Sequence, residues 1–420
     1  MKVKELADFN PSPSYQIQGR RTIDYIDTAS VVEGNLCCVQ RLSDTFPSRA
    51  QREIKTHDIL ISSVRPNLKH NYFVGQGEND MIASSGFIHI RVKNPMEVSP
   101  LFMYYFLTSP TQIRRYAKIA DSSQSAYPSF NKDVIEDIEF PNISLPTQLR
   151  IAGVLGSIDE KMELNRKKIA ELESLAKTIY DYWFVQFDFP DKNGKPYKSS
   201  GGKMVWNEQL KREVPAGWEV CRIGEHITSN RGVSYGTKNI ITDKGYPMIN
   251  LNSFNVDSSY KASGLKFYDG DIPKNKLLSP FDLVMCNTQQ TDLDPKKDII
   301  GKSFLIPDIF PAPITSSHHV TSIHVDDDDL KVLLNALFST REFHSYISGY
   351  ASGTSIKGLD FFGVENCFIA LPAKPIMSKF AEFALACEKA KSIIISEQAL
   401  LQPLRDFLLP LLMNGQAVVE

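Results

Sequence analysis

A long heptad pattern in the middle of the chain constrains the fold more than any other feature. Between residues 145 and 187, positions at alternating steps of four and three are almost all apolar, whereas many residues between them are charged. This pattern predicts a helix with one narrow apolar stripe, which needs a partner helix. About 35 residues at roughly 1.5 Å each would span about 50 Å, too long for an ordinary core helix. The seam positions are Ile151, Leu155, Ile158, Met162, Asn165, Ile169, Leu172, Ala176, Ile179 and Trp183.

Asn165 is the polar exception in this seam. Burial of its amide would cost free energy unless a partner met it, and such residues fix register and orientation in coiled coils. Local exposure of the helix is the alternative. The sequence favours neither reading over the other.

Composition and charge bound the class of protein. With 420 residues, 42% hydrophobic and 23% charged, the chain is expected to form two or three globular domains. Its formal net charge of −2 means that a DNA-binding surface must come from local clustering of Lys and Arg. The six cysteines form no Cys-x-x-Cys pair, which argues against a disulfide framework or thiolate zinc site. The start MKVKELADFN lacks signal-peptide character and no apolar run could span a bilayer, so we expect a cytoplasmic protein without membrane contact.

The sequence before the seam recurs after it, in the same order. Residues 1–144 predict a compact α/β domain, residues 188–215 a connector rich in Lys, Gly, Ser and Pro, and residues 216–370 a second α/β domain. An ordered series of matches at nearly constant offset rarely arises by chance. The matches pair Tyr25–Asp27 with Met248–Asn250, His57–Ser62 with Phe281–Cys286, Ile82–Ser85 with Ile314–Ser317, Phe106–Ser109 with Leu337–Thr340 and Ser122–Ser125 with Ser352–Ser355.

The repeat predicts a second long helix, in residues 371–420, as the partner of the helix in residues 145–187. Antiparallel pairing is expected, because a parallel pair would require the connector to travel the whole length of the helices. The fold class is therefore α/β (α+β), with two tandem domains separated by an antiparallel two-helix coiled coil and related by a pseudo-twofold repeat. Pro403 and Pro410 should kink or restart the second helix. Its seam positions are Phe383, Cys387, Ala390, Ile394, Glu397, Leu401, Leu404, Leu408 and Leu411.

The sequence contains no recognisable catalytic constellation. Gly301-Lys302-Ser303 lacks the upstream glycine of a phosphate-binding loop, since Lys296 stands there. The three histidines at 318, 319 and 324 lack the helical spacing or nearby cysteine of a zinc site, so a structural role at a strand end is favoured. We therefore expect a non-catalytic binding protein with no cofactor or metal in this chain.

Both domains contain basic and polar side chains suited to DNA. Arginine can bridge guanine O6 and N7, glutamine can bridge adenine N6 and N7, and lysine mostly meets phosphate. The polar loops 122–131 and 352–360 occupy the same place in each repeat, although tight structural turns explain them nearly as well. For any single residue, a solvated surface charge is the better explanation. The candidate DNA-binding residues are Arg20, Arg21, Arg41, Arg49, Arg65, Lys69, Gln124, Tyr127, Arg231, Lys238, Lys296, Lys297, Thr354 and Lys357.

The chain resembles the specificity subunits of type I restriction-modification systems. The resemblance is carried by ELESLAKTIYDYWFVQFDFP, NGKPYKSSGGKMVW and VPAGWE, and by tandem α/β domains that each end in Leu-Pro and a long heptad helix. It implies a target-recognition domain in each half, double-stranded DNA as ligand, two modification subunits docked along the helical spacer, and restriction (translocase) subunits. Adenine methylation from S-adenosylmethionine and cleavage driven by ATP and Mg would belong to those partners.

A stiff spacer between two unlike readers predicts a bipartite, asymmetric target. A rod near 50 Å would match about one to one and a half DNA turns between block centres, and one added heptad should lengthen the gap by roughly three base pairs. Two alternatives stay open: the recognition subunit of a modification-only or type IIB-like system, and a coiled-coil scaffold that joins two protein-binding domains. Salt-dependent binding to random duplex DNA would exclude the scaffold.

Overall fold

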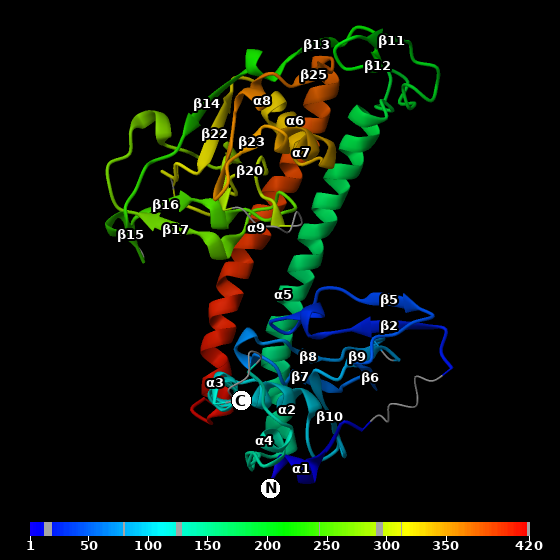
Figure 1. The fold of residues 1–420 in the computed structure, drawn as a ribbon, viewed down its shortest axis with the longest axis vertical. Coiled ribbons are helices and arrows are strands. Elements are labelled where there is room, and N and C mark those ends of the chain that lie inside the picture. The colour runs from blue at the N-terminus through cyan, green and yellow to red at the C-terminus, as the bar shows by residue number, and fades with distance from the viewer. Residues whose placement is uncertain are drawn as a thin grey trace. The chain divides into compact units, whose positions relative to one another are not determined.

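The structure is a computed structural model that describes residues 1–11, 19–78, 80–122, 128–242, 244–290, 297–311 and 313–417 (Figure 1). The chain divides into two compact units, and the boundary between them falls inside its two long helices. Unit 1 comprises Met1–Leu164 and Leu400–Glu420, and unit 2 comprises Asn165–Ala399.

Unit 1 contains two four-stranded sheets. One has the strand order β1-β10-β7-β8 with antiparallel neighbours, and the other has the order β5-β2-β9-β6, in which β2 and β9 are parallel. The strands are β1 (Ala7–Phe9), β2 (Thr22–Ile26), β5 (Gln40–Ser43), β6 (Ala50–Glu53), β7 (Ile59–Ser62), β8 (Asn71–Phe73), β9 (Ile82–Ser84) and β10 (Phe87–Val92), with a small hairpin of β3 (Val31–Val32) and β4 (Asn35–Leu36). The helices of this lobe are α1 (Val3–Leu6), α2 (Pro100–Leu107), α3 (Pro110–Asp121) and α4 (Asp133–Glu136).

Unit 2 repeats the first sheet of unit 1 and the parallel pair of its second sheet, but among the described residues β21 has no outer neighbour equivalent to β6. Its first sheet has the order β14-β22-β18-β20, and its second has the order β15-β17-β16-β21, in which β16 and β21 are parallel. These strands are β14 (Ile227–Arg231), β15 (Ile240–Ile241), β16 (Tyr246–Ile249), β17 (Lys266–Tyr268), β18 (Leu283–Cys286), β20 (Ser303–Leu305), β21 (Thr315–Ser316) and β22 (Val320–Val325). Smaller sheets pair β11 (Met204–Asn207) with β12 (Arg212–Pro215), β13 (Glu219–Arg222) with β25 (Phe368–Leu371), and β24 (Ile356–Leu359) with both β19 (Thr288–Gln290) and β23 (Ala351–Ser352). The helices are α6 (Asp328–Phe338), α7 (Arg341–Ser348) and α8 (Phe362–Glu365).

The repeat extends to single turns. After the parallel strand β2, Asp27 caps a 3-10 turn, and Asn250 caps the equivalent turn after β16. His57 and Phe281, which precede β7 and β18, both have positive φ angles, of 70° and 65°. Side chains that satisfy the same backbone groups hold the same local geometry in both halves. The predicted internal repeat is confirmed at this level.

Two long helices complete the units: α5 (Leu145–Tyr180), which continues into a π-helical turn at Asp181–Val185, and α9 (Lys374–Met413). Within unit 2, Asn165 contacts Glu397 and Glu173 contacts Lys391, so the two segments run antiparallel. Within unit 1, the α5 residues Ile151 and Leu155 share a core cluster with the α9 residues Leu409 and Leu412. Further along in the same unit, Asp159 pairs with Arg405 at 2.5 Å.

Two expectations about α9 are wrong. The helix does not restart at Pro403 or Pro410, because it continues through both residues to Met413; a kink at either proline stays a prediction. Leu404, expected in the seam, is 45% exposed, whereas Leu409 and Leu412 are buried. A straight helix of 3.6 residues per turn drifts about 20° per heptad from a strict 3.5 repeat, so the buried face has turned by about 60° after three heptads, more than half of the roughly 100° step between residues.

Asn165 is buried, and its amide nitrogen donates a hydrogen bond to Glu397 Oε2 at 2.8 Å. Of the two alternatives for Asn165, burial with a hydrogen-bond partner is therefore correct, and local exposure of the helix is not. We expect Asn165→Leu to destabilise unit 2 by about 2 kcal/mol, because a hydrogen bond to a charged group is lost beside a desolvated carboxylate. Asn165→Leu with Glu397→Leu should recover much of that loss. Urea unfolding of both single variants and the double variant measures the coupling, and a coupling near zero would contradict this account.

Candidate nucleic-acid interface

In unit 1, four segments meet at the turn between β9 and β10. Ser85 N donates to Arg49 O at 2.7 Å, and Ser63 N donates to Gly86 O at 3.0 Å. Arg65 N then donates to Pro128 O at 2.9 Å. We call this arrangement turn site 1 and define it as Arg49, Ser63–Arg65, Ser84–Gly86 and Pro128–Phe130.

Turn site 1 contains two exposed arginines, Arg49 and Arg65. Arg65 has a φ of 46° and begins a 3-10 turn at Pro66–Leu68, which ends at the exposed Lys69 with a φ of 54°. Non-glycine residues rarely adopt positive φ, so the surrounding backbone bonds hold this loop in a defined shape. Lys69 Nζ lies 3.8 Å from Glu33 Oε1, a weak surface pair.

Other candidate arginines of unit 1 lie outside this site. Arg20 forms an ion pair with Glu53 of β6 and also donates to Asp80 O. Arg41 lies on β5, at the opposite edge of the sheet from β6, and pairs with Asp24 at 3.4 Å. Arg21 is exposed just before β2. Gln124 and Tyr127 lie outside the described residues.

Unit 2 has an equivalent turn between β21 and β22. Val233 N donates to Ser316 O at 2.7 Å, and Asn287 N donates to His319 O at 3.0 Å. The latter bond corresponds to that between Ser63 and Gly86, and Leu359 N donates to Asn287 O as Phe130 N does to Ser63 O. We call this arrangement turn site 2 and define it as Arg231–Val233, Asn287–Gln289, Ser317–His319 and the strand β24.

The side chains of turn site 2 differ from those of turn site 1. The rings of His318 and His319 lie 3.8 Å apart, and His319 Nδ1 is 2.7 Å from Thr288 Oγ1. Burial lowers the pKa of His319, and the nearby charges of His318, Arg231 and Lys266 lower it further. The His319 imidazole is therefore neutral at pH 7, with one donor and one acceptor nitrogen, of which Nδ1 is paired with Thr288.

The remaining candidates of unit 2 divide between this site and its surroundings. Arg231 is exposed at the end of β14, and Lys357 lies on β24 opposite Gln289, so both belong to turn site 2. Thr354 is exposed in the loop before β24, and Lys238 is exposed in the 3-10 turn at Thr237–Asn239. Lys297 is also exposed, whereas Lys296 lies outside the described residues.

Sequence reasoning missed several residues of these sites. Thr288, Gln289 and the two adjacent histidines were not DNA candidates, and neither was the Ser84–Gly86 turn. The repeat contained a usable signal, because the match of Ile82–Ser85 with Ile314–Ser317 places both turns at equivalent points.

Gly232 holds the backbone of turn site 2 close to β21. A Cβ atom at this position would lie 2.0 Å from Ser316 O. We expect Gly232→Ala to destabilise unit 2 by about 1 to 3 kcal/mol, because a backbone contact cannot relax by rotating a side chain. Gly236→Ala is the matched control, since its Cβ would meet only Asn239 Oδ1, at 3.9 Å. Equal melting temperatures for the two variants would contradict the expectation.

The described residues lack two kinds of feature. No group of three or more His, Cys, Asp or Glu side chains among them could hold a metal ion. None of their helices combines the length and apolar character needed to cross a lipid bilayer.

Comparisons with known proteins show which proteins this chain is similar to. Residues 1–174 match the type I restriction modification DNA specificity domain. The type I restriction enzyme HindI specificity subunit of Haemophilus influenzae is 26% identical over 97% of this chain and 95% of its own length. The MjaIX specificity subunit of Methanocaldococcus jannaschii is 24% identical over 83% of this chain and 76% of its own length.

A solved structure shares the fold. The crystal structure of a type I restriction-modification system S subunit from M. genitalium covers 98% of this chain and 95% of its own, with a TM-score of 0.59 and 13% identity. The mixed α/β fold with a long central helix, expected from the sequence, is confirmed. With a match to this specificity domain in residues 1–174 and similarity to such a subunit over 97% of its length, this chain is similar to the specificity subunits of type I restriction-modification systems.

Proposed function

We propose that the chain reads a bipartite, asymmetric DNA target, one block with turn site 1 and the other with turn site 2. The observation that carries this proposal is the pair of equivalent turns, built by corresponding backbone hydrogen bonds on a repeated topology. Equivalent placement supports a shared role for the two turns. Methyl transfer and cleavage are assigned to partner subunits.

Unlike side chains at the two sites support unlike DNA blocks. Turn site 1 offers the guanidinium groups of Arg49 and Arg65, which suit guanine or phosphate oxygens. Turn site 2 offers Arg231 together with Thr288 and the neutral His319, which present both donors and acceptors. The first block is therefore expected to favour guanine, and the second to combine a phosphate contact with mixed hydrogen bonding.

Partner docking is assigned to an outward-facing stripe on α9. Within unit 1, Leu400, Leu404 and Phe407 are 74%, 45% and 63% exposed, and they follow one another at steps of four and three. These apolar side chains are exposed within their own unit, and their heptad spacing is the one needed to pack against a further helix. We assign this stripe to a helix of a modification subunit, with two such subunits per specificity subunit.

The stripe can be tested by co-purification with the modification subunit. Leu400→Asp combined with Phe407→Asp is expected to weaken the complex at least tenfold, because charged groups would have to be desolvated in an apolar contact. The exposed Gln402→Asp variant, on the same turn of helix, is the control. Undiminished assembly of the double variant would refute this docking face.

DNA binding itself is tested by titrating random duplex DNA at several salt concentrations. Neutralisation of phosphates releases counterions, so the logarithm of the binding constant should fall linearly with the logarithm of the salt concentration. A protein-binding scaffold would show no such slope. Absence of salt-dependent binding would therefore overturn the proposed function.

A further inference from the structure

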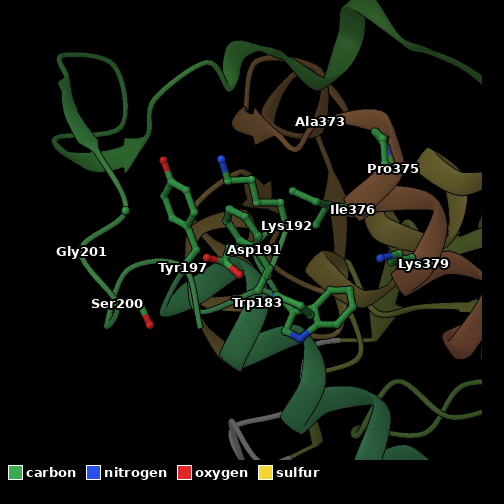
Figure 2. Close-up of a pocket in the computed structure, with 13 residues that line it drawn as sticks. Trp183, Asp191, Lys192, Tyr197, Ser200, Gly201, Ala373, Pro375, Ile376 and Lys379 are labelled. Carbon is green, nitrogen blue, oxygen red and sulfur yellow. The ribbon is translucent and has the colours of Figure 1, made fainter. Parts of the chain in front are cut away.

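The connector forms one wall of an aromatic pocket in unit 2 (Figure 2). The pocket has a volume of about 570 Å³. Its lining comes from three segments: Trp183 in the turn after α5, residues 189–192, 197 and 200–202 of the connector, and the start of α9 with Ile376 and Lys379. The connector therefore does more than join two domains.

The walls of this pocket are fixed by packing. The ring of Phe189 stacks between those of Tyr197, at 4.7 Å, and Trp218, at 5.2 Å. Tyr197 N donates to Phe189 O, and a Cβ at Gly202 would lie 2.5 Å from the Tyr197 ring. Because the site is ordered in advance, an occupant would lose little free energy to ordering the protein.

Lys192 and Lys379 give the rim a positive charge. Both are exposed, and neither lies within ion-pair distance of a carboxylate among the described residues. The Asp191 carboxylate also lines the pocket, but it accepts hydrogen bonds from the amides of Asn193 and Lys195 at 2.7 and 2.8 Å. The ammonium groups of Lys192 and Lys379 are therefore available to bind an anionic group of a ligand.

Further exposed apolar side chains are close to the pocket residues in sequence. Tyr182, next to Trp183, is 38% exposed, and on β11, which follows Gly202 closely, Val205 and Trp206 are 47% and 55% exposed. A small molecule held in the pocket would leave these side chains uncovered. Exposed aromatic residues around a preformed pocket are typical of protein-protein contacts.

We propose that this pocket captures an acidic peptide segment of a partner protein. One aromatic or large aliphatic side chain of the segment would enter between Trp183 and Ile376, and flanking carboxylates would meet Lys192 and Lys379. This mode resembles other interfaces in which a buried anchor supplies affinity and charges at the rim supply specificity. The inference does not depend on DNA reading by the two turn sites.

The test uses the full chain and a fluorescein-labelled peptide with a central Trp flanked on each side by four Glu or Asp residues. Saturable binding is expected in fluorescence anisotropy. Ile376→Asp and Lys379→Glu should each weaken it at least tenfold, whereas Lys195→Glu, outside the pocket in the same connector, should leave it within twofold. Peptides with Ala for Trp, or Lys for the acidic residues, should bind at least tenfold more weakly.

Three results would overturn the proposal: no saturable binding of the acidic peptide, equal binding by the Ile376→Asp variant, or displacement of the peptide by ATP, which would indicate a nucleotide site. Circular dichroism verifies that each variant is folded. DNA affinity is measured in parallel, because it should stay unchanged in the pocket variants and so separates failure of this proposal from failure of the DNA-reading proposal.

Discussion

Inserting one heptad into both α5 and α9 is expected to abolish methylation of the original target and to direct methylation to targets with a longer gap. The insertions belong between Lys168 and Ile169 in α5, and between Ile393 and Ile394 in α9. These points lie between the Asn165–Glu397 and Glu173–Lys391 contacts of unit 2, so both contacts persist. Seven residues add about 10 Å, or roughly three base pairs.

The size of this effect follows from geometry. About 10 Å exceeds the tolerance of any hydrogen bond, so two readers cannot both engage the original spacing. Three base pairs also rotate the second block by roughly 100° about the DNA axis, so binding to the new target should be weaker than that of the parent to its own.

Mapping of methylated bases in cells that carry the parent or the inserted protein, with its modification partner, measures the change. Insertion into α5 alone is the control, because it mismatches the helices and should produce no new target. Continued methylation at the original gap by the doubly inserted protein would contradict the proposed spacer.

Reversing two charges in turn site 1 is expected to remove recognition of the first block. Arg49→Glu with Arg65→Glu should weaken binding to the target by about 100-fold or more, since each well-placed arginine contact contributes about 1 to 3 kcal/mol. The slope of the logarithm of the binding constant against the logarithm of the salt concentration should become shallower, by the equivalent of about two phosphate contacts. Fluorescence anisotropy with the assembled complex measures both quantities.

Arg41→Glu supplies the matched comparison within unit 1. Arg41 is an exposed arginine on β5 that already pairs with Asp24, at the sheet edge opposite β6. Its reversal should change affinity less than threefold. Arg65→Lys should keep the salt slope but relax base preference, because lysine cannot make a bidentate contact. Equal effects of the Arg41 and Arg49/Arg65 changes would show that bulk charge, and not turn site 1, governs binding.

Much of the fold was predictable because it depends on periodicity. The seam from Ile151 to Trp183 predicted α5, and the repeat predicted α9 and a second α/β domain. Leu404 was misplaced because a strict 3.5-residue repeat ignores the slow drift of a straight helix. The continuity of α9 through Pro403 was missed because local helix rules do not include the packing that supports a helix lacking one hydrogen bond.

The candidate sites were less predictable because they depend on long-range pairing. The sequence could not show that Arg20 and Arg41 form ion pairs, since their partners Glu53 and Asp24 lie on strands whose pairing it does not define. The two histidines of turn site 2 could not be recognised alone. Their place beside Arg231 and Thr288 exists only after β21 and β22 are paired with their neighbours.

The central claim is that one chain carries two unlike DNA readers. Genome-wide mapping of methylated bases in cells that express this subunit with its modification partner tests it most directly. The account predicts one motif made of two different short blocks around a gap of fixed length and unread sequence. A single uninterrupted motif, or two identical blocks, would contradict it.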